Sequence, residues 1–325
     1  MEVLQPMNDL NMKSSTTMGL NIAMWVPLVL PPLFWAGNFV AGRAVRDDVP
    51  PMTLAFSRHM LALLCLLPFC WGSLRSEAHR YWEIRWQLAR VALTGLGGFN
   101  LFIYLGLHST TAANGLLLNS TIPVLIVLIG AGLYGQKLRI QQAAGMAVSC
   151  LGVLAIIMQG DVDRLVRMQF SHGDLIVFIG MICFALYTHW LRAIPADLNR
   201  VGLLGAQLLI ASIALLPFFG WEFMTGQRAN WNIGSMVATF YVAIVASLGA
   251  TLLYMTGVSR VGAARAGLFI HLIPIYGAIL STVFLGETVH LYHALGFTAI
   301  LAGLAISNWQ RAQNPHQSLN NSASM

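Results

Sequence analysis

The chain has 325 residues, of which 57% are hydrophobic and only 9% are charged. A soluble domain carries about 25% charged residues, so this chain cannot cover a soluble surface and is predicted to lie in a bilayer. The net charge of +6 therefore bears on orientation in a membrane and is not a sign of nucleic-acid binding.

Ten apolar stretches are long enough to be membrane-spanning helices, each of which needs about 20 mostly apolar residues. They lie at about 22–42, 52–71, 89–107, 112–134, 140–158, 173–192, 200–220, 236–257, 265–285 and 290–309. The polar residues 1–21 and the Asn-, Ser- and Gln-rich residues 310–325 are predicted to be disordered cytoplasmic segments. The connections are too short to hold a soluble catalytic domain.

The sequence from Gly106 to Val153 is repeated 151 positions later, at Gly257–Leu304. Ten of the 48 aligned positions are identical, and four of the identical residues are glycine and one is proline. These residue types determine close packing, kinks and turns. The preceding segment repeats at an offset of 149, where Leu66–Phe69 matches Leu215–Phe218. The chain is therefore predicted to consist of two similar halves.

Each half contains five predicted helices, so the second half enters the bilayer from the side opposite to the first. The halves, residues 22–158 and 173–309, are then inverted repeats joined by the loop 159–172, an arrangement typical of secondary transporters. With the N-terminus in the cytoplasm, twelve of the 18 Lys and Arg residues fall in cytoplasmic segments and five in external ones. This bias predicts that both termini are cytoplasmic.

Three short motifs occur in a fixed order along the chain. They are Leu33–Gly42 (LFWAGNFVAG) in the first span, Pro50–Arg58 (PPMTLAFSR) at the second, and Phe284–Glu287 (FLGE) at the end of the ninth. In this order they resemble the EamA-type transporters of the drug/metabolite transporter superfamily, over residues 25–309. The resemblance implies ten helices in two inverted five-helix repeats, and the movement of small metabolites across bacterial inner membranes. Gly135-Gln136 stands where the family often repeats Gly-Glu, so the resemblance implies no symmetric pair of acids.

Several polar residues lie deep within the predicted spans. Asn119 and His271 flank the matched prolines Pro123 and Pro274, each of which removes a backbone hydrogen bond from its helix. Polar side chains beside a broken helix at mid-depth are expected at the substrate site of such a transporter. Asn38 is also a candidate ligand. The alternative for each is a hydrogen bond to a neighbouring helix.

Aromatic residues with polar edges also lie well inside the spans. The candidates for a cavity wall are Trp35, Tyr187, Tyr254 and Tyr276, with core packing as the alternative. Arg43 and Arg192 occupy the same position in the two halves and are predicted gates at the two mouths, or else snorkelling ends of helices. Arg58 is predicted to lie near the interface or to line a wet vestibule.

The acidic residues form no relay through the membrane. Asp174 and Glu287 both lie at helix ends, where the helix dipole explains an acid. His271 is the candidate proton carrier near mid-depth, so proton coupling is included in the prediction as an option.

These features predict an all-α integral membrane protein that is not an enzyme. We expect a secondary transporter that exports small metabolites, such as amino acids or related amphipathic solutes, across the inner (plasma) membrane by alternating access. The expected partners are the lipid bilayer and a small-molecule substrate, with no nucleic acid, metal or cofactor. The alternatives are a membrane-embedded enzyme, whose usual motifs the sequence lacks, and a non-transporting scaffold, which would not need polar residues at mid-depth.

Overall fold

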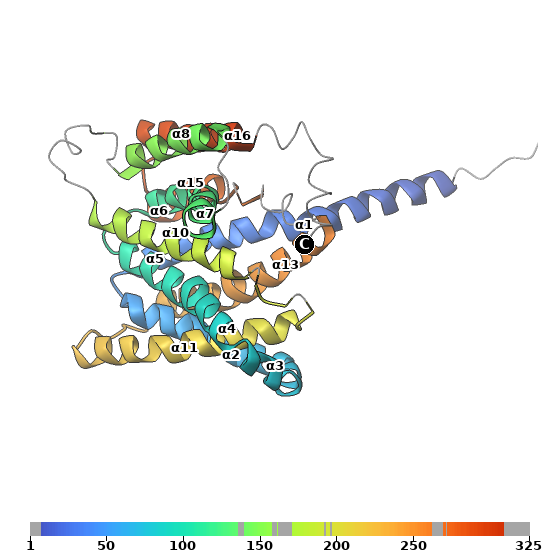
Figure 1. Ribbon diagram of the computed structural model, residues 1–325, viewed down its shortest axis with the longest axis vertical. Helices are drawn as coiled ribbons and strands as arrows, with labels where there is room; N and C mark the ends of the chain where they lie inside the picture. The colour runs from blue at the N-terminus through green and yellow to red at the C-terminus, as the bar shows by residue number, and fades with distance from the viewer. Residues whose placement is uncertain are drawn as a thin grey trace, which may run out of the picture.

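A computed structural model describes residues 8–135, 140–157, 161, 171–191, 193–195, 197–261, 269–270 and 272–308. All regular secondary structure in these ranges is helical (Figure 1). The helices of the first part of the chain are α1 Asn8–Ala44, α2 Pro51–Ser76, α3 Ala78–Glu83, α4 Arg85–Val91, the π-helix η1 Ala92–Gly98, α5 Phe99–Leu107, α6 Ala112–Asn119, α7 Ile122–Tyr134 and α8 Ile140–Ile157. Those of the second part are α10 His172–Leu191, α11 Arg200–Met224, α12 Ile233–Phe240, the π-helix η2 Tyr241–Gly249, α13 Ala250–Val261, α15 Leu272–Leu285 and α16 Leu291–Asn308.

Six helical stretches in the described part are long and apolar enough to cross a membrane. They are Trp25–Ala44, Pro51–Ser76, Arg85–Leu107, His172–Leu191, Arg200–Met224 and Ile233–Tyr254. Helices α6 and α7 are together also long and apolar enough to cross a membrane, with a bend of 45° between them. The other predicted spans coincide with shorter apolar helices, in α8, α15 and α16. The protein is therefore a multi-pass membrane protein, and the number of ten spans stays a prediction.

The first helix starts earlier than the sequence predicts. It begins at Asn8, so most of residues 1–21, expected to be disordered, are helical. The expected tail, 310–325, lies outside the described residues, as does most of the loop 159–172.

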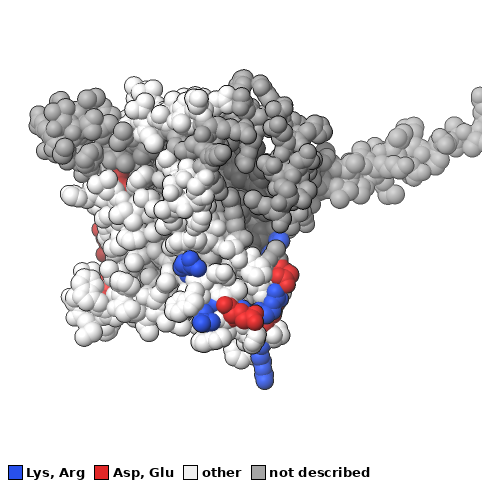
Figure 2. Space-filling model, viewed as in Figure 1, with Lys and Arg blue, Asp and Glu red and all other residues white. Residues whose placement is uncertain are grey.

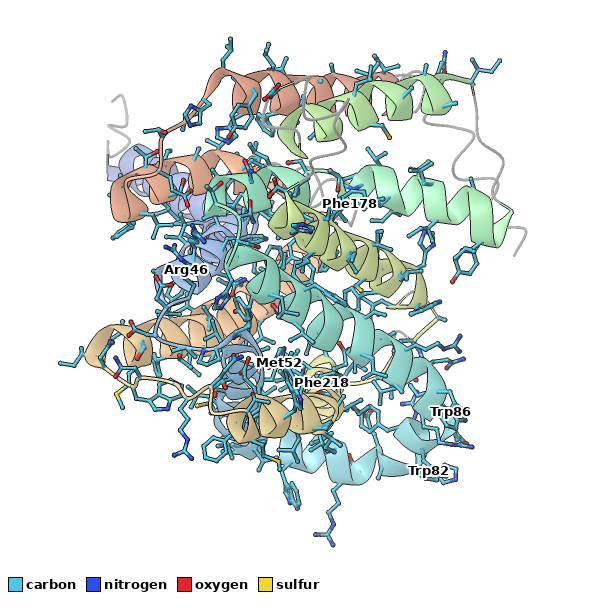
Figure 3. The ribbon with its side chains drawn as sticks, turned by 90° about the vertical axis from the view of Figure 1, so that its left-hand side faces the viewer. Arg46, Met52, Trp82, Trp86, Phe178 and Phe218 are labelled. Carbon is cyan, nitrogen blue, oxygen red and sulfur yellow. The ribbon has the colours of Figure 1, made fainter. Side chains whose placement is uncertain are left out.

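Large apolar side chains cover the outside of the bundle. Phe69 is 77% exposed and Ile213 is 63% exposed, as expected for residues that face lipid. The face shown in Figure 2 is mostly uncharged: its Lys, Arg, Asp and Glu atoms gather near α3 and the start of α11, with a few acidic atoms at the left edge. Near α3, Arg80 pairs with Glu77 and Asp197. Trp82 and Trp86 project there, away from Arg46 and Met52 (Figure 3), as expected of aromatic residues at a membrane interface.

The helices pair across the two parts of the chain. Helix α2 packs along α11, and α8 packs along α16. Helix α1 packs against η2, α13 and α15, whereas α10 packs against η1, α5 and α7 (Figure 1). The first helix of each part therefore contacts mainly the later helices of the other part.

Glycine allows the closest of these contacts. A Cβ atom on Gly106 of α5 would lie 2.5 Å from Val177 of α10, and one on Gly257 of α13 would lie 2.8 Å from Leu28 of α1. The two contacts are equivalent in the repeat: Gly257 lies 151 positions after Gly106, and Leu28 lies 149 positions before Val177. The repeated glycines thus lie where equivalent helices approach each other.

The third span of each part of the chain contains a π-helix. The π-helix η1 lies between α4 and α5, and η2 lies between α12 and α13. The π-helices η1 and η2 end at Gly98 and Gly249, which are 151 positions apart. A π-helix widens the helical turn by one residue and frees local backbone groups, so it is frequent at functional sites. The two π-helices were not predicted, because hydropathy along the sequence does not distinguish a π-helix from an α-helix.

Replacing Gly286 by valine is expected to lower the stability of the protein by about 1–2 kcal/mol, because a β-branched residue is strained in the left-handed conformation. Gly286 ends α15 with φ 65°, and in the described part of the chain no atom beyond its chain neighbours lies within 4 Å of the place of its missing Cβ, so conformation and not space is limiting. Gly135 ends α7 in the same way, with φ 61°. Thermal unfolding of the purified variant in detergent measures the loss. Gly286→Asn is the control, because Asn tolerates this conformation. Equal melting of the Val, Asn and wild-type proteins would contradict the assignment.

Candidate functional site

The candidate site is built around Arg58, which lies inside the bundle. Arg58 is the eighth residue of α2, about 10 Å along the helix from its first residue. Its side chain is buried, with only 4% of the residue exposed. A guanidinium at the centre of a bilayer costs roughly 2.5–3.5 kcal/mol, so an arginine held here needs close polar partners.

Four residues from three other helices supply these partners. Arg58 Nη1 donates to Asn38 Oδ1 of α1 at 2.6 Å, to Asn100 Oδ1 of α5 at 2.7 Å, and to the Tyr104 hydroxyl of α5. Its Nε and Nη2 atoms donate to Ser247 Oγ in η2 at 3.2 and 2.5 Å. We call these five residues the Arg58 cluster. It joins α1, α2, α5 and η2 at one point.

The cluster is held in place by further hydrogen bonds. The Tyr104 hydroxyl donates to Asn38 Oδ1 at 2.7 Å, and Asn100 Nδ2 donates to the Leu96 carbonyl in η1 at 2.8 Å. Ser247 Oγ donates to the carbonyl of Val242, five residues earlier in η2, at 2.7 Å. Both π-helices therefore position ligands of Arg58, and a change in either would be felt at the guanidinium.

The oxygen atoms around Arg58 are all uncharged. Among the residues that the structure describes, no Asp or Glu oxygen lies within ion-pair distance of the guanidinium. The partners are two amide oxygens and two hydroxyls. The positive charge is thus solvated by neutral groups but not neutralised.

An aromatic edge lies beside the Arg58 cluster. The rings of Trp35 and Tyr254 meet edge to face with centroids 5.2 Å apart. Trp35 Nε1 donates to the carbonyl of Ala246 at 3.2 Å, so Trp35 and Arg58 bind adjacent residues of η2. Tyr241, the first residue of η2, donates its hydroxyl to the Phe34 carbonyl at 3.1 Å. An apolar aromatic surface and a cation therefore lie next to each other between α1 and η2.

The other predicted ligands lie elsewhere. Tyr187 of α10 packs on η1, where a Cβ atom on Gly95 would lie 2.2 Å from its ring. Asn119 is buried at the end of α6, directly before the bend into α7 that Pro123 predicts. Tyr276 lies in α15, which packs against α6. The structure thus joins three of the predicted residues, Trp35, Asn38 and Tyr254, around the Arg58 cluster. His271 and Arg192 lie outside the described residues.

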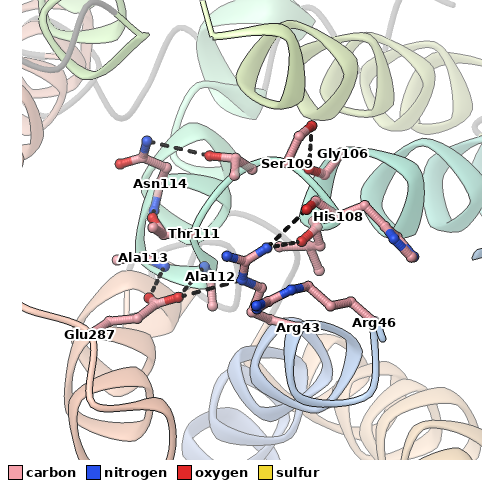
Figure 4. Close-up of polar contacts among 12 residues, drawn as sticks. Arg43, Arg46, Gly106, His108, Ser109, Thr111, Ala112, Ala113, Asn114 and Glu287 are labelled. Atoms are coloured by element: carbon pink, nitrogen blue, oxygen red, sulfur yellow. Dashed lines mark hydrogen bonds and ion pairs between the residues drawn. The ribbon is translucent and has the colours of Figure 1, made fainter. Parts of the chain in front are cut away.

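Arg43 lies at one end of the bundle and binds the turn after α5. Arg43 Nη1 donates to the carbonyls of Leu107 at 2.6 Å and His108 at 3.2 Å (Figure 4). Glu287 accepts hydrogen bonds from the amides of Ala112 and Ala113 at 3.0 and 3.1 Å, and lies 4.0 Å from Arg43. Glu287 therefore caps the N-terminus of α6 and not that of the helix that follows it. Burial lowers the pKa of His108, so its imidazole is neutral at pH 7.

A second polar group closes the same end. Asp174, at the start of α10, accepts hydrogen bonds from the Thr110 hydroxyl and from Asn114 Nδ2. Asn114 Oδ1 lies 2.9 Å from His293 Nε2 of α16. We call the contacts of Arg43 and Glu287, together with those of Asp174 and His293, the Arg43-end latch. It ties α1, α6, α10 and α16 together.

Arg58, Asn100, Tyr104 and Ser247 were not among the site residues predicted from the sequence. One signal was available, because Arg58 is a lone charge inside an apolar span, and such charges are usually functional. Asn100 is also a polar residue deep in a span. Tyr104 gave a similar signal, as an aromatic residue with a polar edge inside a span. Ser247 gave no signal, because its role depends on the meeting of α2 and η2 at Arg58.

Comparisons with known proteins identify the family of the chain. The model of the EamA-like transporter family matches residues 23–158 and 171–309. An uncharacterized transporter of Archaeoglobus fulgidus is 25% identical over 290 residues, which cover 88% of this chain and 97% of the relative. The uncharacterized transporter YyaM of Bacillus subtilis is 25% identical over 214 residues, covering 66% of this chain and 70% of the relative.

A further relative has a more specific name. A protein of Streptantibioticus cattleyicolor named "Probable terminal-alkyne amino-acid exporter" is 23% identical over 291 residues, 90% of this chain and 95% of the relative. A solved structure with the name "Crystal structure of protein" matches with a TM-score of 0.57 and 16% identity, over 90% of this chain and 98% of that chain, and shows the fold alone. Because the family model matches most of both parts of the chain, this protein belongs to the EamA-like transporter family.

Proposed function

We propose that this protein is a secondary transporter that exports small metabolites by alternating access, with the Arg58 cluster and the adjoining aromatic edge as its substrate site. The observation that carries the proposal is the buried polar cluster between α1, α2, α5 and η2 in a member of a transporter family. Amide, hydroxyl and guanidinium groups inside a membrane bundle are costly, and they are retained where a polar solute must bind. Asn119, Tyr187, Tyr276 and His271 are proposed to line the rest of the path.

We propose ten membrane spans in two inverted halves. The contacts between α2 and α11 support this arrangement. A Cβ atom on Gly205 would lie 2.7 Å from Cys70 Sγ, and the rings of Phe56 and Phe219 stack at 4.8 Å. In the repeat with an offset of 149, Cys70 is equivalent to Phe219 and Phe56 is equivalent to Gly205. The contact between Gly205 and Cys70 is therefore related to the contact between Phe56 and Phe219 by exchange of the two halves.

The Arg43-end latch gives the closed gate of this proposed cycle. Arg43 and Glu287 hold the turn between α5 and α6 against α1, and Asp174 holds it against α10. Substrate release through this end requires these bonds to break, while Arg192 is the proposed counterpart of Arg43 at the opposite end. Proton coupling through His271 remains part of the proposal.

Export of amino acids or related solutes is the proposed direction and substrate class. The name of the Streptantibioticus relative supports it, as does the pairing of a cation with an aromatic edge at the cluster. The proposed location is the inner membrane, with both termini and most Lys and Arg residues in the cytoplasm.

Reporter fusions test this orientation. An enzyme active only in the cytoplasm, fused after Arg311, is expected to be active, and the same enzyme fused after Asp163 is expected to be silent, because the Lys and Arg bias places only the first position inside. Activity after Asp163 together with silence after Arg311 would reverse the orientation.

Efflux from proteoliposomes tests the function itself. Vesicles that contain the purified protein are loaded with a filtered small-molecule extract of bacterial cells supplemented with the twenty amino acids, and mass spectrometry follows the loss of each component. At least one component is expected to leave faster than from protein-free vesicles, with a rate that saturates with its concentration. Equal loss of every component from both kinds of vesicle would overturn the proposal.

A further inference from the structure

We propose that the substrate carries a carboxylate, and that Arg58 is the residue that binds it. This inference rests on the proposed function, because it takes the Arg58 cluster as the substrate site. It adds the chemical class of the ligand and the residue that selects it.

The first argument is the missing counter-charge. Arg58 is 96% buried, and in the described part of the chain its four partners are neutral. Buried charges in proteins are normally paired, since neutral groups alone compensate only part of the lost hydration. An anionic group on the substrate would supply the charge that the protein does not.

The second argument is the donor geometry of the guanidinium. Nη2 carries two hydrogens, and Ser247 Oγ accepts only one of them. Among the described residues no second acceptor lies at Nη2, whereas Nη1 has three. An incoming carboxylate can bind Nη2 and displace Ser247 or one of the Nη1 partners. Arginine binds carboxylates through two parallel hydrogen bonds, a match that amide and hydroxyl oxygens do not offer.

The third argument is the asymmetry between the halves. The offset of 149 places Gln207 of α11 at the position equivalent to Arg58. Gln207 is 3% exposed, and its Oε1 atom has no hydrogen-bond partner in the part of the chain that the structure describes. The bundle therefore holds a cation at only one of the two equivalent positions and a neutral amide at the other, so the repeat alone does not explain the buried charge of Arg58.

The neighbouring residues indicate the rest of the ligand. Trp35 and Tyr254 form the aromatic edge beside the cluster, and Trp35 binds the residue of η2 that precedes Ser247. A solute whose carboxylate lies at Arg58 would place its apolar part against these rings. The inferred class is therefore an amphipathic carboxylate, which includes amino acids with apolar side chains. Because Arg58 is buried, such a solute reaches it only when α1 and η2 separate.

Matched pairs of ligands test the inference by binding and not by transport. The panel is L-phenylalanine, L-leucine, 3-phenylpropionate and 4-methylpentanoate, each compared with its primary amide. The amide has nearly the same shape but lacks the negative charge of the carboxylate. Isothermal titration calorimetry measures their binding to the full-length protein in detergent. At least one carboxylate is expected to bind the wild type more tightly than its amide. Removing one partner of a buried charge pair weakens binding strongly, so Arg58→Gln is expected to weaken that carboxylate roughly 30-fold or more and leave the amide unchanged.

A second variant keeps the test decisive if Arg58→Gln fails to fold. Asn38→Asp puts a carboxylate of the same shape at the atom that already accepts from Arg58 and Tyr104. This built-in anion is expected to raise the melting temperature and to abolish carboxylate binding. Arg228→Gln removes a charge from an exposed loop and is the control, with wild-type binding expected.

Each outcome separates this inference from the proposed function. A wild-type protein that binds no carboxylate in preference to its amide overturns the inference, as does an Arg58→Gln or Asn38→Asp variant with wild-type carboxylate affinity. A purely structural role of Arg58 predicts that Arg58→Gln weakens acid and amide equally. Vesicle efflux without a carboxylate preference would leave the transporter proposal standing and remove only this inference, whereas Arg58-dependent binding without efflux would do the reverse.

Discussion

Replacing Glu222 by alanine is expected to destabilise the protein by about 3–5 kcal/mol, because it leaves buried hydrogen-bond donors without an acceptor. Glu222 lies near the end of α11 and is 2% exposed. Its carboxylate accepts from the Thr53 amide at 2.6 Å, the Thr53 hydroxyl at 2.7 Å and the Met52 amide at 3.2 Å. The N-cap of α2, Pro50, makes no side-chain cap, so Glu222 performs this task from a distant helix.

Thermal unfolding of the purified protein in detergent measures this loss. Glu83→Ala is the matched control, because Glu83 is exposed and its one ion pair among the described residues is with His79 at 3.4 Å. Its melting temperature is expected to stay at the wild-type value. Glu222→Gln keeps one acceptor oxygen and is expected to fall between the two. A melting temperature of Glu222→Ala equal to that of Glu83→Ala would show that Glu222 does not hold α2.

Replacing Gly303 by leucine is expected to prevent the close packing of α8 and α16 and to reduce the yield of folded protein several-fold. A Cβ atom at Gly303 would lie 2.2 Å from Ser149 Oγ and 2.3 Å from the Gly145 carbonyl. The backbone carbonyl cannot move away without shifting α8. Overpacking of this kind costs about 1–3 kcal/mol even where side chains can adapt. Here it would also break the hydrogen bond from Ser149 Oγ to the Ile300 carbonyl, 3.2 Å long.

Size-exclusion chromatography of the detergent extract measures the folded fraction. Gly132→Leu in α7 is the control, since among the described residues no atom beyond its chain neighbours and its own helix backbone lies within 4 Å of the place of its Cβ, and its yield is expected to match the wild type. Gly303→Ala adds one methyl group and is expected to give an intermediate yield. If Gly303→Leu elutes as a single peak at wild-type yield, α8 and α16 do not meet as described.

Much of the architecture could be predicted from local sequence, because the bilayer imposes apolar spans about 20 residues long. Pro123 predicted the break after Asn119, and the structure confirms it as the bend between α6 and α7. The repeated glycines predicted turns and close packing, and Gly135 and Gly286 both end a helix in the left-handed conformation. These features depend on one residue and its neighbours in the chain.

The site could be predicted only in part, because its geometry depends on which helices meet. Trp35, Asn38 and Tyr254 were selected by residue type and depth alone. Arg58 was predicted to lie near an interface or to line a wet vestibule, because it is close to one end of its helix. Its burial comes from contacts with α1, α5 and η2. Capping by Glu287 across the molecule is long-range for the same reason.

The pairing of α1 with the second part of the chain also has a consequence for biosynthesis. Trp35 binds the carbonyl of Ala246, a residue 211 positions later. Chains grow at about 5–20 residues per second, so this partner is synthesised roughly 10–40 s after Trp35. During that interval α1 has already left the ribosome, while η2 and α13 have not yet been synthesised. The Arg58 cluster around Asn38 is complete only after α5 and η2 have followed. Premature termination before residue 241 would therefore leave the first helix without most of its packing surface. Such a fragment is a substrate for quality-control proteolysis and not half of a working protein.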